Sequence, residues 1–411
     1  MLEKNRCQGI PNPFKLRGEV SKPFTAVWVS HMLVEVFLLM HPALVPVFMK
    51  EFGLSIFQAG LLITVPNLCR LVIVIPTGIL ADRSGPQRFV ILSMLVGGAS
   101  ALLLSQSASA SILFVSLSLI MISVTLYHPP GMSIISRLFP DQVERSTAIG
   151  LHGASGCIGQ ALGTISLGLL LAQYGWRSCY LLFSVPLLAW MFVLAGMKIP
   201  RWTELPRPSG RETDDSRNGD IERTSHDKSV MNLGFFLLVL SMGINALANN
   251  GVIAFMTTYM TRAENLTVEV ASIIFGAGPL IGIVGSILAG YMSSRLGDKS
   301  ALTLICVGQV VFLLGLITVP SAYFATLSFL MYQMFLSGLW TPSTSMVASL
   351  MGRTRGGTAY SLFYFSHDAL GAVSPLIAAV LIAGFGLIAP FLFGVVLLVL
   401  DTFLIQLIRL R

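Results

Sequence analysis

The sequence predicts an all-α integral membrane protein with twelve transmembrane helices in two six-helix pseudo-repeats. Only 11% of its 411 residues are charged and 54% are hydrophobic, whereas soluble domains carry about 25% charged residues. Long apolar runs recur at roughly the 20 residues that a helix needs to cross the hydrocarbon core. They lack the two-residue alternation of a membrane β-barrel. Helices also satisfy their own backbone hydrogen bonds in lipid, so the predicted fold class is all-α.

Twelve apolar runs fix the expected elements in chain order. We expect helices at residues 24–50, 57–81, 88–107, 111–137, 146–172, 176–198, 231–261, 267–293, 300–319, 324–350, 357–382 and 388–408. They imply a cytoplasmic N-terminal segment at 1–23, a first six-helix bundle at 24–198, a cytoplasmic linker at 199–230 and a second bundle at 231–411. The linker is rich in charge, Pro, Ser and Gly, a composition that does not build a core.

The basic residues assign the two sides of the membrane. With the loops placed alternately, one side receives 22 of the 26 Lys and Arg residues, including the N-terminal segment and the linker. Because Lys and Arg resist translocation, both termini are expected in the cytoplasm. The net charge of +7 is therefore a topology signal, and nucleic acid is not an expected partner. Residues 1–23 are polar and basic, so no cleavable signal peptide is predicted.

The two halves repeat one pattern. A shift of 212 positions carries Gly78, Arg83 and Gly85 onto Gly290, Arg295 and Gly297. The same shift carries Pro130 onto Pro342 and Gly159 onto Gly371. Repeated six-helix units with a substrate site between them near the bilayer midplane are one plan of secondary transporters.

A short motif follows the second predicted helix and joins it to the third. It consists of Gly78, Asp82, Arg83, Gly85 and Arg88. It resembles the signature of the major facilitator family, although Gln87 stands where a second basic residue is usual. The resemblance implies that this loop latches a cytoplasmic gate. In the second half, Arg295 repeats the pattern but Ser294 replaces the acid, which predicts a weaker latch there.

Small residues mark the fifth predicted helix. Its glycines, spaced to lie on one face, are Gly150, Gly153, Gly156, Gly159 and Gly163. The stripe resembles the antiporter signature of the same family, with Thr164 in place of a proline, and it equally suits close helix packing. The stripe, Ser30-His31 with Glu35, and Tyr127-His128-Pro129 together resemble the fosmidomycin-resistance type of drug exporter.

Ionisable residues inside the predicted helices are candidate functional groups, because a charge at mid-bilayer costs several kcal/mol. Glu35 and Arg70 lie at the same depth on neighbouring helices, and His31 is one turn from Glu35. We expect Glu35 to be a proton site tuned by Arg70 and His31; a permanent structural ion pair is the alternative. Asp368 with His367 is the corresponding candidate in the second half, for protons or for substrate.

Other polar and aromatic residues could line a central cavity. Those expected there are His128, His152, Asn245, Asn249, Asn250, Trp340 and Tyr364. Pro129-Pro130 should open the helix beside His128, and the asparagines suit either a half-broken helix or interhelical hydrogen bonds. Asp401, near the end of the last helix, is expected to reach the cytoplasmic interface.

The pattern favours a proton-coupled exporter of a small amphipathic or anionic compound that works by alternating access. An uptake symporter for an organic acid, sugar or similar nutrient uses the same scaffold, and a non-transporting scaffold or receptor is a further alternative. An enzyme is not expected, since nucleotide loops and nucleophile motifs are absent from the sequence. The five scattered cysteines predict neither a disulfide nor a metal site, and no cofactor is expected. Expected partners are a small-molecule substrate, protons and the lipid bilayer, with the protein a monomer in a bacterial cytoplasmic (inner) membrane.

Overall fold

The computed structural model describes residues 18–139, 142–197, 233–319, 321–351 and 356–409, and these residues form helices joined by short turns. The all-helical class is thereby confirmed. The first half contains α1 (Gly18–Glu35), α2 (Met40–Ala43), α3 (Val45–Phe52), α4 (Ile56–Ser84), α5 (Pro86–Ser105), α6 (Ala110–Leu138) and α7 (Gln142–Gly196). The second contains α8 (Leu233–Arg262), α9 (Val268–Leu296), α10 (Asp298–Thr318), α11 (Ala322–Gly338), α12 (Trp340–Met351), α13 (Gly356–Phe385) and α14 (Ala389–Leu407).

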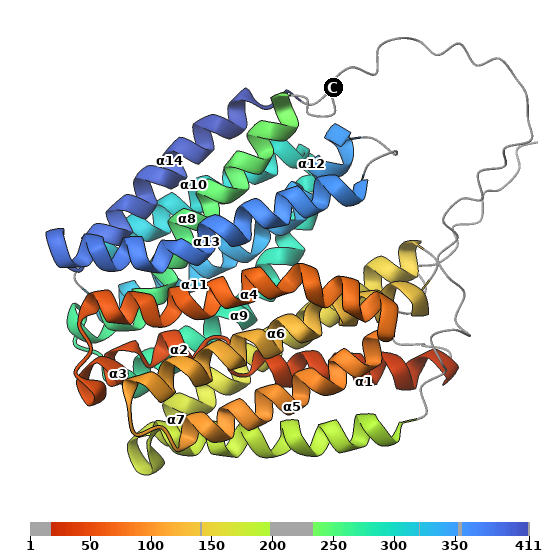
Figure 1. Cartoon of the computed structure of the whole chain (residues 1–411). Helices are drawn as coiled ribbons and strands as arrows, with labels where there is room; N and C mark the ends of the chain where they lie inside the picture. The colour runs from red at the N-terminus through yellow and green to blue at the C-terminus, as the bar shows by residue number, and fades with distance from the viewer. Residues whose placement is uncertain (1–17, 140–141, 198–232, 320, 352–355, 410–411) are drawn as a thin grey trace, which may run out of the picture.

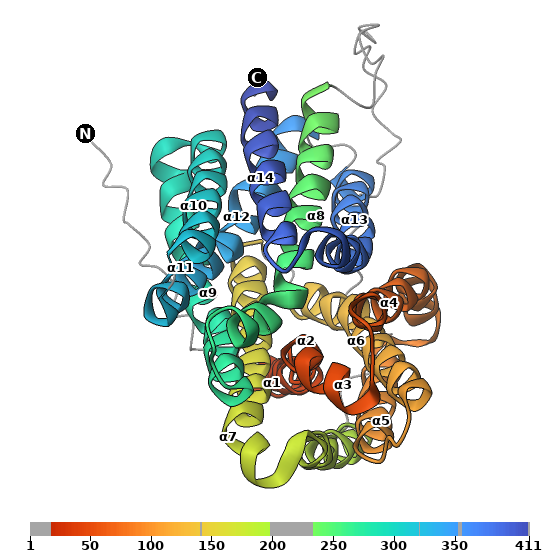
Figure 2. The same ribbon diagram turned by 90° about the vertical axis from the view of Figure 1, so that its left-hand side faces the viewer.

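The helices lie in two groups that follow the order of the chain. In Figure 1, α1 to α7 lie in the lower part and most of α8 to α14 in the upper part, while α9 reaches the first group and packs against α7. We call the end of the molecule that carries the α4–α5 and α9–α10 turns the linker end, because α7 ends and α8 begins there. The opposite end, which carries α2 and α3, is the distal end and faces the viewer in Figure 2. Most of the predicted N-terminal segment and the whole predicted linker lie outside the described residues, which leave out 1–17 and 198–232.

The length and apolar character of the helices identify a membrane protein. Among the described residues, eleven helical segments are long and apolar enough to cross a bilayer. Large apolar side chains also cover the outside of the bundle; Val72, Leu169 and Phe192 are 73%, 65% and 70% exposed. In water such a surface would be costly, and in lipid it is the expected one.

One of those segments is 50 residues long, from Thr147 to Gly196, and combines two of the predicted helices. Gly175 interrupts it with φ 71° and ψ 165°, a conformation that glycine adopts without a Cβ penalty. The chain turns back there and its second part runs beside α5 (Figure 1).

Two predicted helices are broken where the sequence suggested continuity. The first divides into α1, α2 and α3, and the tenth divides at Leu339 into α11 and α12. The first break covers residues 36–39, just before Pro42, and the second lies at Leu339, three residues before Pro342. A proline has no N–H to continue the hydrogen-bond ladder. By contrast, Pro129 and Pro130 lie inside a continuous α6, so the predicted opening there is wrong.

The two groups of helices meet closely at the distal end. A Cβ atom at Gly60 of α4 would lie 2.5 Å from the Cβ of Ala379 on α13, so the two backbones nearly touch. Gly168 of α7 likewise lies against the backbone of Glu269 on α9, and α2 and α3 pack beside α8 (Figure 2). Towards the linker end a Cβ at Gly78 or Gly290 would contact only its own half. The interface is therefore tightest at the distal end.

Candidate functional site

A cavity of about 700 Å³ lies between the two halves, a size typical of small-molecule sites. Its first-half wall comes from α4, α6 and the segment around α2. Its second-half wall comes from α8, α12 and α13. The polar and aromatic residues in the wall are His41, Asn67, Arg70, His128, Asn250, Trp340, Tyr364, His367 and Asp368.

An ion pair crosses this cavity from one half to the other. Arg70 Nη2 on α4 lies 3.8 Å from Asp368 Oδ2 on α13, and the two side chains are 34% and 37% exposed. His367 Nδ1 lies 3.2 Å from the other oxygen of Asp368. The contact is looser than a bidentate arginine–carboxylate pair, so the guanidinium keeps donors available to the cavity.

Beside Arg70 and Asp368 on the wall, Trp340 and Tyr364 form an aromatic surface. Their rings stack with centroids 5.5 Å apart at 28°, and Trp340 also contacts the His367 ring at 4.7 Å. Aromatic faces of this kind suit flat apolar groups and cations.

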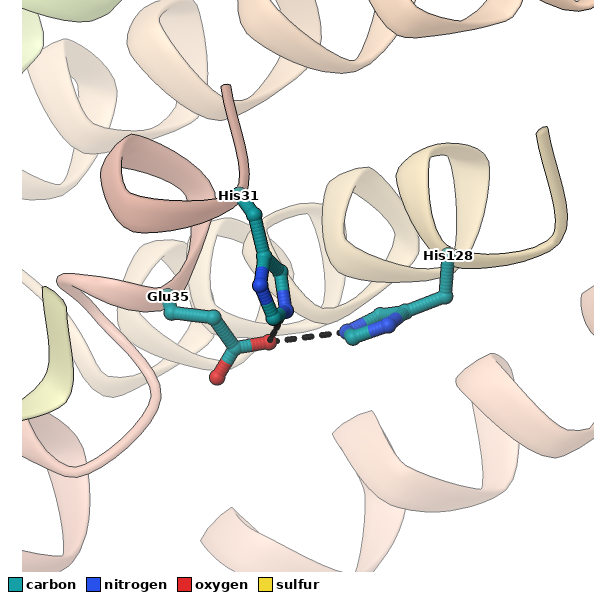
Figure 3. A group of neighbouring side chains, drawn as sticks. All are labelled: His31, Glu35 and His128. Carbon is teal, nitrogen blue, oxygen red and sulfur yellow. Dashed lines mark hydrogen bonds and ion pairs between the residues drawn. The ribbon is translucent and has the colours of Figure 1, made fainter. Parts of the chain in front are cut away.

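A second cluster lies just behind the cavity wall, around Glu35. This carboxylate is only 2% exposed, and its Oε1 lies 2.8 Å from His128 Nε2. Gln160 Nε2 donates a hydrogen bond of 2.8 Å to Oε2. Figure 3 shows His31 and His128 directed at the same oxygen, with His31 Nε2 at 3.9 Å. Since the half-exposed His128 also lines the cavity, it connects the buried carboxylate to the solvent-accessible space.

Backbone geometry explains why Glu35 depends on these partners. It is the last residue of α1, where the helix dipole is negative and disfavours an ionised carboxylate. His31 is oriented by its Nδ1, 2.7 Å from the carbonyl of His152, so that the other nitrogen faces Glu35. Its ring fits because residue 156 is glycine; a Cβ there would lie 2.6 Å from the ring.

The donor atoms of His31, Glu35 and His128 lie within 4.8 Å of one another, which would admit a metal ion. A tetrahedral zinc site with bonds of about 2.0–2.1 Å separates its ligand atoms by roughly 3.3 Å. The 2.8 Å contact between Glu35 and His128 is shorter and is a hydrogen bond. The three residues therefore fit a shared proton better than a metal.

The structure corrects several expected positions. The predicted pairing of Arg70 with Glu35 is wrong, because Arg70 faces Asp368 across the cavity while Glu35 turns towards α6 and α7. His152 is buried behind the wall, where its ring stacks on His31 at 3.9 Å and Tyr127 lies within hydrogen-bond distance. Equal depth in the membrane did not reveal which way each side chain points around its helix.

The asparagines of α8 divide between two environments. Asn250 lines the cavity, whereas Asn245 and Asn249 are buried within the second half. Asn245 donates to Asp401, and Asn249 donates to Gln309 and accepts from Tyr332. Helix α8 is continuous, so these two residues serve interhelical hydrogen bonding and not a cavity. The expectation that Asp401 reaches the interface is also wrong, since it is 0% exposed.

The predicted gate residues lie at the linker end. Gly78 and Arg83 belong to the last turns of α4, Gly85 turns the chain with φ 95°, and Arg88 is in the first turn of α5. Asp82 is in α4 as well, but its side chain lies outside the described residues. Arg83, Arg88 and Arg295 are exposed, and the Arg295 guanidinium lies over the Tyr291 ring.

In the second half, the repeated gate motif lacks its acid, but another acid lies at the same turn between α9 and α10. Asp298, the first residue of α10, accepts hydrogen bonds from Ser293 of α9 and Ser345 of α12. The sequence comparison missed it because it lies four positions after Ser294, not at the repeated position. Gln160 was also missed; the signal was an amide inside an apolar, glycine-rich helix, where it needs a partner.

Comparison with known proteins gives several transporters of low sequence identity. The chain is 26% identical over 270 residues to a cis,cis-muconate transport protein of Acinetobacter baylyi, covering 64% of this chain and 63% of that one. It is 23% identical over 356 residues to a probable sulfoacetate transporter of Cupriavidus necator, covering 82% and 81%. It is 28% identical over 159 residues to the multidrug efflux pump LfrA of Mycolicibacterium smegmatis, covering 38% and 31%. The chain thus spans less than two thirds of the length of the muconate protein and of LfrA.

The fold matches a solved transporter structure. A bacterial homologue of the human lysosomal transporter Spinster superposes with a TM-score of 0.76 at 16% identity, covering 96% of this chain and 97% of that one. The family model for the Major Facilitator Superfamily matches residues 27–375. The chain is therefore a multi-pass membrane transporter that belongs to the Major Facilitator Superfamily.

Proposed function

We propose that the protein is a proton-coupled secondary transporter that moves a small organic anion by alternating access. The observation that carries this proposal is the cavity between the halves, with Arg70 and Asp368 contributed from opposite sides and the Glu35–His128 pair adjoining it. An enzyme is not part of the proposal, since the superfamily is one of transporters.

The proposed topology has twelve passes, two six-helix bundles at 24–198 and 231–411, and both termini in the cytoplasm. The turn at Gly175 supports two passes within α7. The excess of Lys and Arg in the segments of the linker end supports a cytoplasmic position for that end. The tight contact at the distal end then corresponds to a state closed on the outer side, in a bacterial cytoplasmic membrane.

Glu35 and His128 are the groups proposed to accept the transported proton and to exchange it with the cavity. Their 2.8 Å contact holds one hydrogen that either the imidazole or the carboxyl group can carry. A buried carboxylate without a permanent cation beside it is a suitable proton carrier, because it can become neutral when the cavity closes. His31 and Gln160 hold the carboxylate in place from α1 and α7.

An anionic substrate is supported by two independent observations. Arg70 is one-third exposed in the cavity, and its partner Asp368 is as far as 3.8 Å away. The relatives with the longest aligned regions reported above are named for cis,cis-muconate and sulfoacetate, both organic anions. These names supply the first compounds to be tested.

Drug export is the second candidate. The aromatic wall formed by Trp340 and Tyr364 suits an amphipathic compound. LfrA and a puromycin resistance protein of Streptomyces alboniger, 28% identical over 189 residues, match shorter regions. An exporter of the fosmidomycin-resistance type would belong to this candidate.

The test uses the full chain in liposomes that contain a pH-sensitive dye, under an imposed pH gradient. The panel is cis,cis-muconate, sulfoacetate and benzoate as anions, and puromycin and methyl viologen as cations. The proposal predicts proton movement that depends on at least one anion. Proton movement with the cations alone supports drug export. The absence of compound-dependent flux across the panel would contradict coupled transport and favour a scaffold or receptor role.

A further inference from the structure

The ion pair between Arg70 and Asp368 determines how a solute and a proton can be coupled. We propose that an anionic group of the solute binds Arg70 in place of Asp368 and that the released Asp368 takes up a proton. Anion and proton then cross the membrane together in the same direction, which makes the protein a symporter. This inference rests on the proposed transport function. It adds the residue that binds the anion and the relative direction in which anion and proton move.

Arg70 is available for such an exchange. Its contact with Asp368 is 3.8 Å long, and among the described residues no hydrogen bond to Arg70 supplements it. A guanidinium offers five N–H donors in a planar fork that matches a carboxylate or sulfonate with two parallel hydrogen bonds. A solute oxyanion can therefore make a better contact with Arg70 than Asp368 does.

The charges around Asp368 explain why it takes up a proton when the anion binds. The groups that face it are Arg70 from α4, His128 from α6 and its neighbour His367 on α13. Once a solute anion occupies Arg70, two negative groups share one permanent cation. Under that condition one of the two acids binds a proton, since like charges at short distance disfavour double ionisation.

Closure of the cavity determines whether the proton and the anion move in the same direction. The empty site holds one cation and one anion, and the site loaded with a singly charged anion and a proton again has no net charge from these groups. An anion bound without a proton would leave a net negative charge in a closing, membrane-embedded cavity, which is costly. The carrier then changes readily between its inward-open and outward-open states only when it holds both anion and proton or when it is empty. A cationic solute would instead compete with the proton for Asp368 and produce exchange.

The aromatic wall narrows the class of solute. Trp340, which also contacts His367, lies beside the acid that the solute displaces. A carboxylate or sulfonate bound at Arg70 would place the rest of the molecule near the faces of Trp340 and Tyr364. The expected substrate is a small organic acid with a flat conjugated or aromatic body.

The experiment measures protons taken up on binding, in purified full-length protein in lipid nanodiscs with a pH dye and minimal buffer. Cis,cis-muconate, sulfoacetate and benzoate are the anions, and benzamide is the neutral counterpart of benzoate. We expect uptake of about one proton per bound benzoate, which carries a single negative charge. Asp368→Asn should still bind the anion but take up no proton at this site. Arg70→Gln should bind it about tenfold or more weakly, whereas Arg262→Gln, which changes an exposed cation at the end of α8, should behave as wild type.

The inference is overturned if anion binding releases protons, if Arg70→Gln binds anions as wild type does, or if benzamide binds as tightly as benzoate. Transport of puromycin or methyl viologen in exchange for protons, without anion binding, would also overturn it while leaving coupled transport intact. The absence of flux in the liposome panel contradicts the transport function itself, so the two failures are distinguishable.

Discussion

At the scale of single residues, the protein places five of its six histidines in or directly behind the cavity wall: His31, His41, His128, His152 and His367. Only His128 combines a hydrogen bond to Glu35 with exposure to the cavity. That combination is what a group needs in order to pass a proton between solvent and a buried acid. His41 lines the same cavity, and its Nδ1 has no hydrogen-bond partner among the described residues.

His128 and His41 therefore form a matched pair for mutation. In His128→Gln the amide can still donate to Glu35 but cannot carry a proton, so proton-driven accumulation should fall at least about tenfold. Solute binding should change little, because Arg70 is untouched. His41→Gln should retain most of the accumulation, as measured with the same solute in liposomes. Equal loss in both variants would contradict a specific role for His128.

Residue partnerships were the least predictable part of the site. The sequence located the buried charges, because Glu35, Arg70 and Asp368 interrupt long apolar runs. It did not reveal that Arg70 lies beside a residue 298 positions later, since that contact depends on how two separate bundles meet. Asp401 was misplaced for a similar reason: closeness to the chain end suggested exposure, whereas packing against α8 and α10 buries it.

At the scale of elements, the glycine stripe of α7 acts in two ways. Gly159 and Gly163 lie against the backbone of α1 and of the turn that follows it, where a Cβ atom would collide with the carbonyl oxygens of Met32 and Val36. A Cβ atom at Gly150 or Gly153 would have no neighbouring atom within 4 Å. The sequence showed the stripe but could not show that only part of it is a contact face.

This difference supports a stability prediction. Gly159→Ala should destabilise the protein by about 1–3 kcal/mol, because α1 and α7 must separate to admit the methyl group. Gly153→Ala should be neutral or slightly stabilising, since alanine favours helix and meets no atom. Thermal unfolding of both variants in the same detergent measures the effect. An unchanged melting temperature in Gly159→Ala would contradict the close packing.

Helix positions were predictable to within a few residues, because apolar length and turn residues set them. The broken α1–α2–α3 and α11–α12 segments were not, although Pro42 and Pro342 were visible. Proline inside a membrane helix can also be accommodated without a break, as Pro129 and Pro130 are in α6. Neighbouring helices decide between these outcomes, and a single sequence does not give them.

At the scale of the whole molecule, the halves touch at the distal end and should rock about the central cavity. Gly60 is a contact point for this motion, since a Cβ there would lie 2.5 Å from the Cβ of Ala379. Gly60→Ala should disfavour the state closed at the distal end. In a cysteine-free background, a cysteine introduced at the cavity residue Met132 should then react faster with an impermeant maleimide added outside. Gly150→Ala, remote from this contact, should leave the rate unchanged; a similar rate in both variants would contradict the assignment.

The gate motif predicts a complementary effect at the linker end. If Asp82 latches the cytoplasmic side in the outward-open state, Asp82→Asn should lower the maximal transport rate more than it changes the half-saturating solute concentration. Initial rates over a range of solute concentrations measure both quantities. A maximal rate equal to that of wild type would refute the latch.

Glu35→Gln tests the central claim most directly, because it keeps the hydrogen-bonding shape of the proton site and removes its charge. Liposomes carrying either wild type or the variant receive one labelled solute, and two rates are measured: accumulation driven by a pH gradient and exchange of labelled for unlabelled solute without a gradient. We predict that Glu35→Gln loses accumulation and keeps exchange, which separates coupling from substrate binding. Accumulation at the wild-type level in Glu35→Gln would contradict a proton site at Glu35 and leave the carboxylate a structural group.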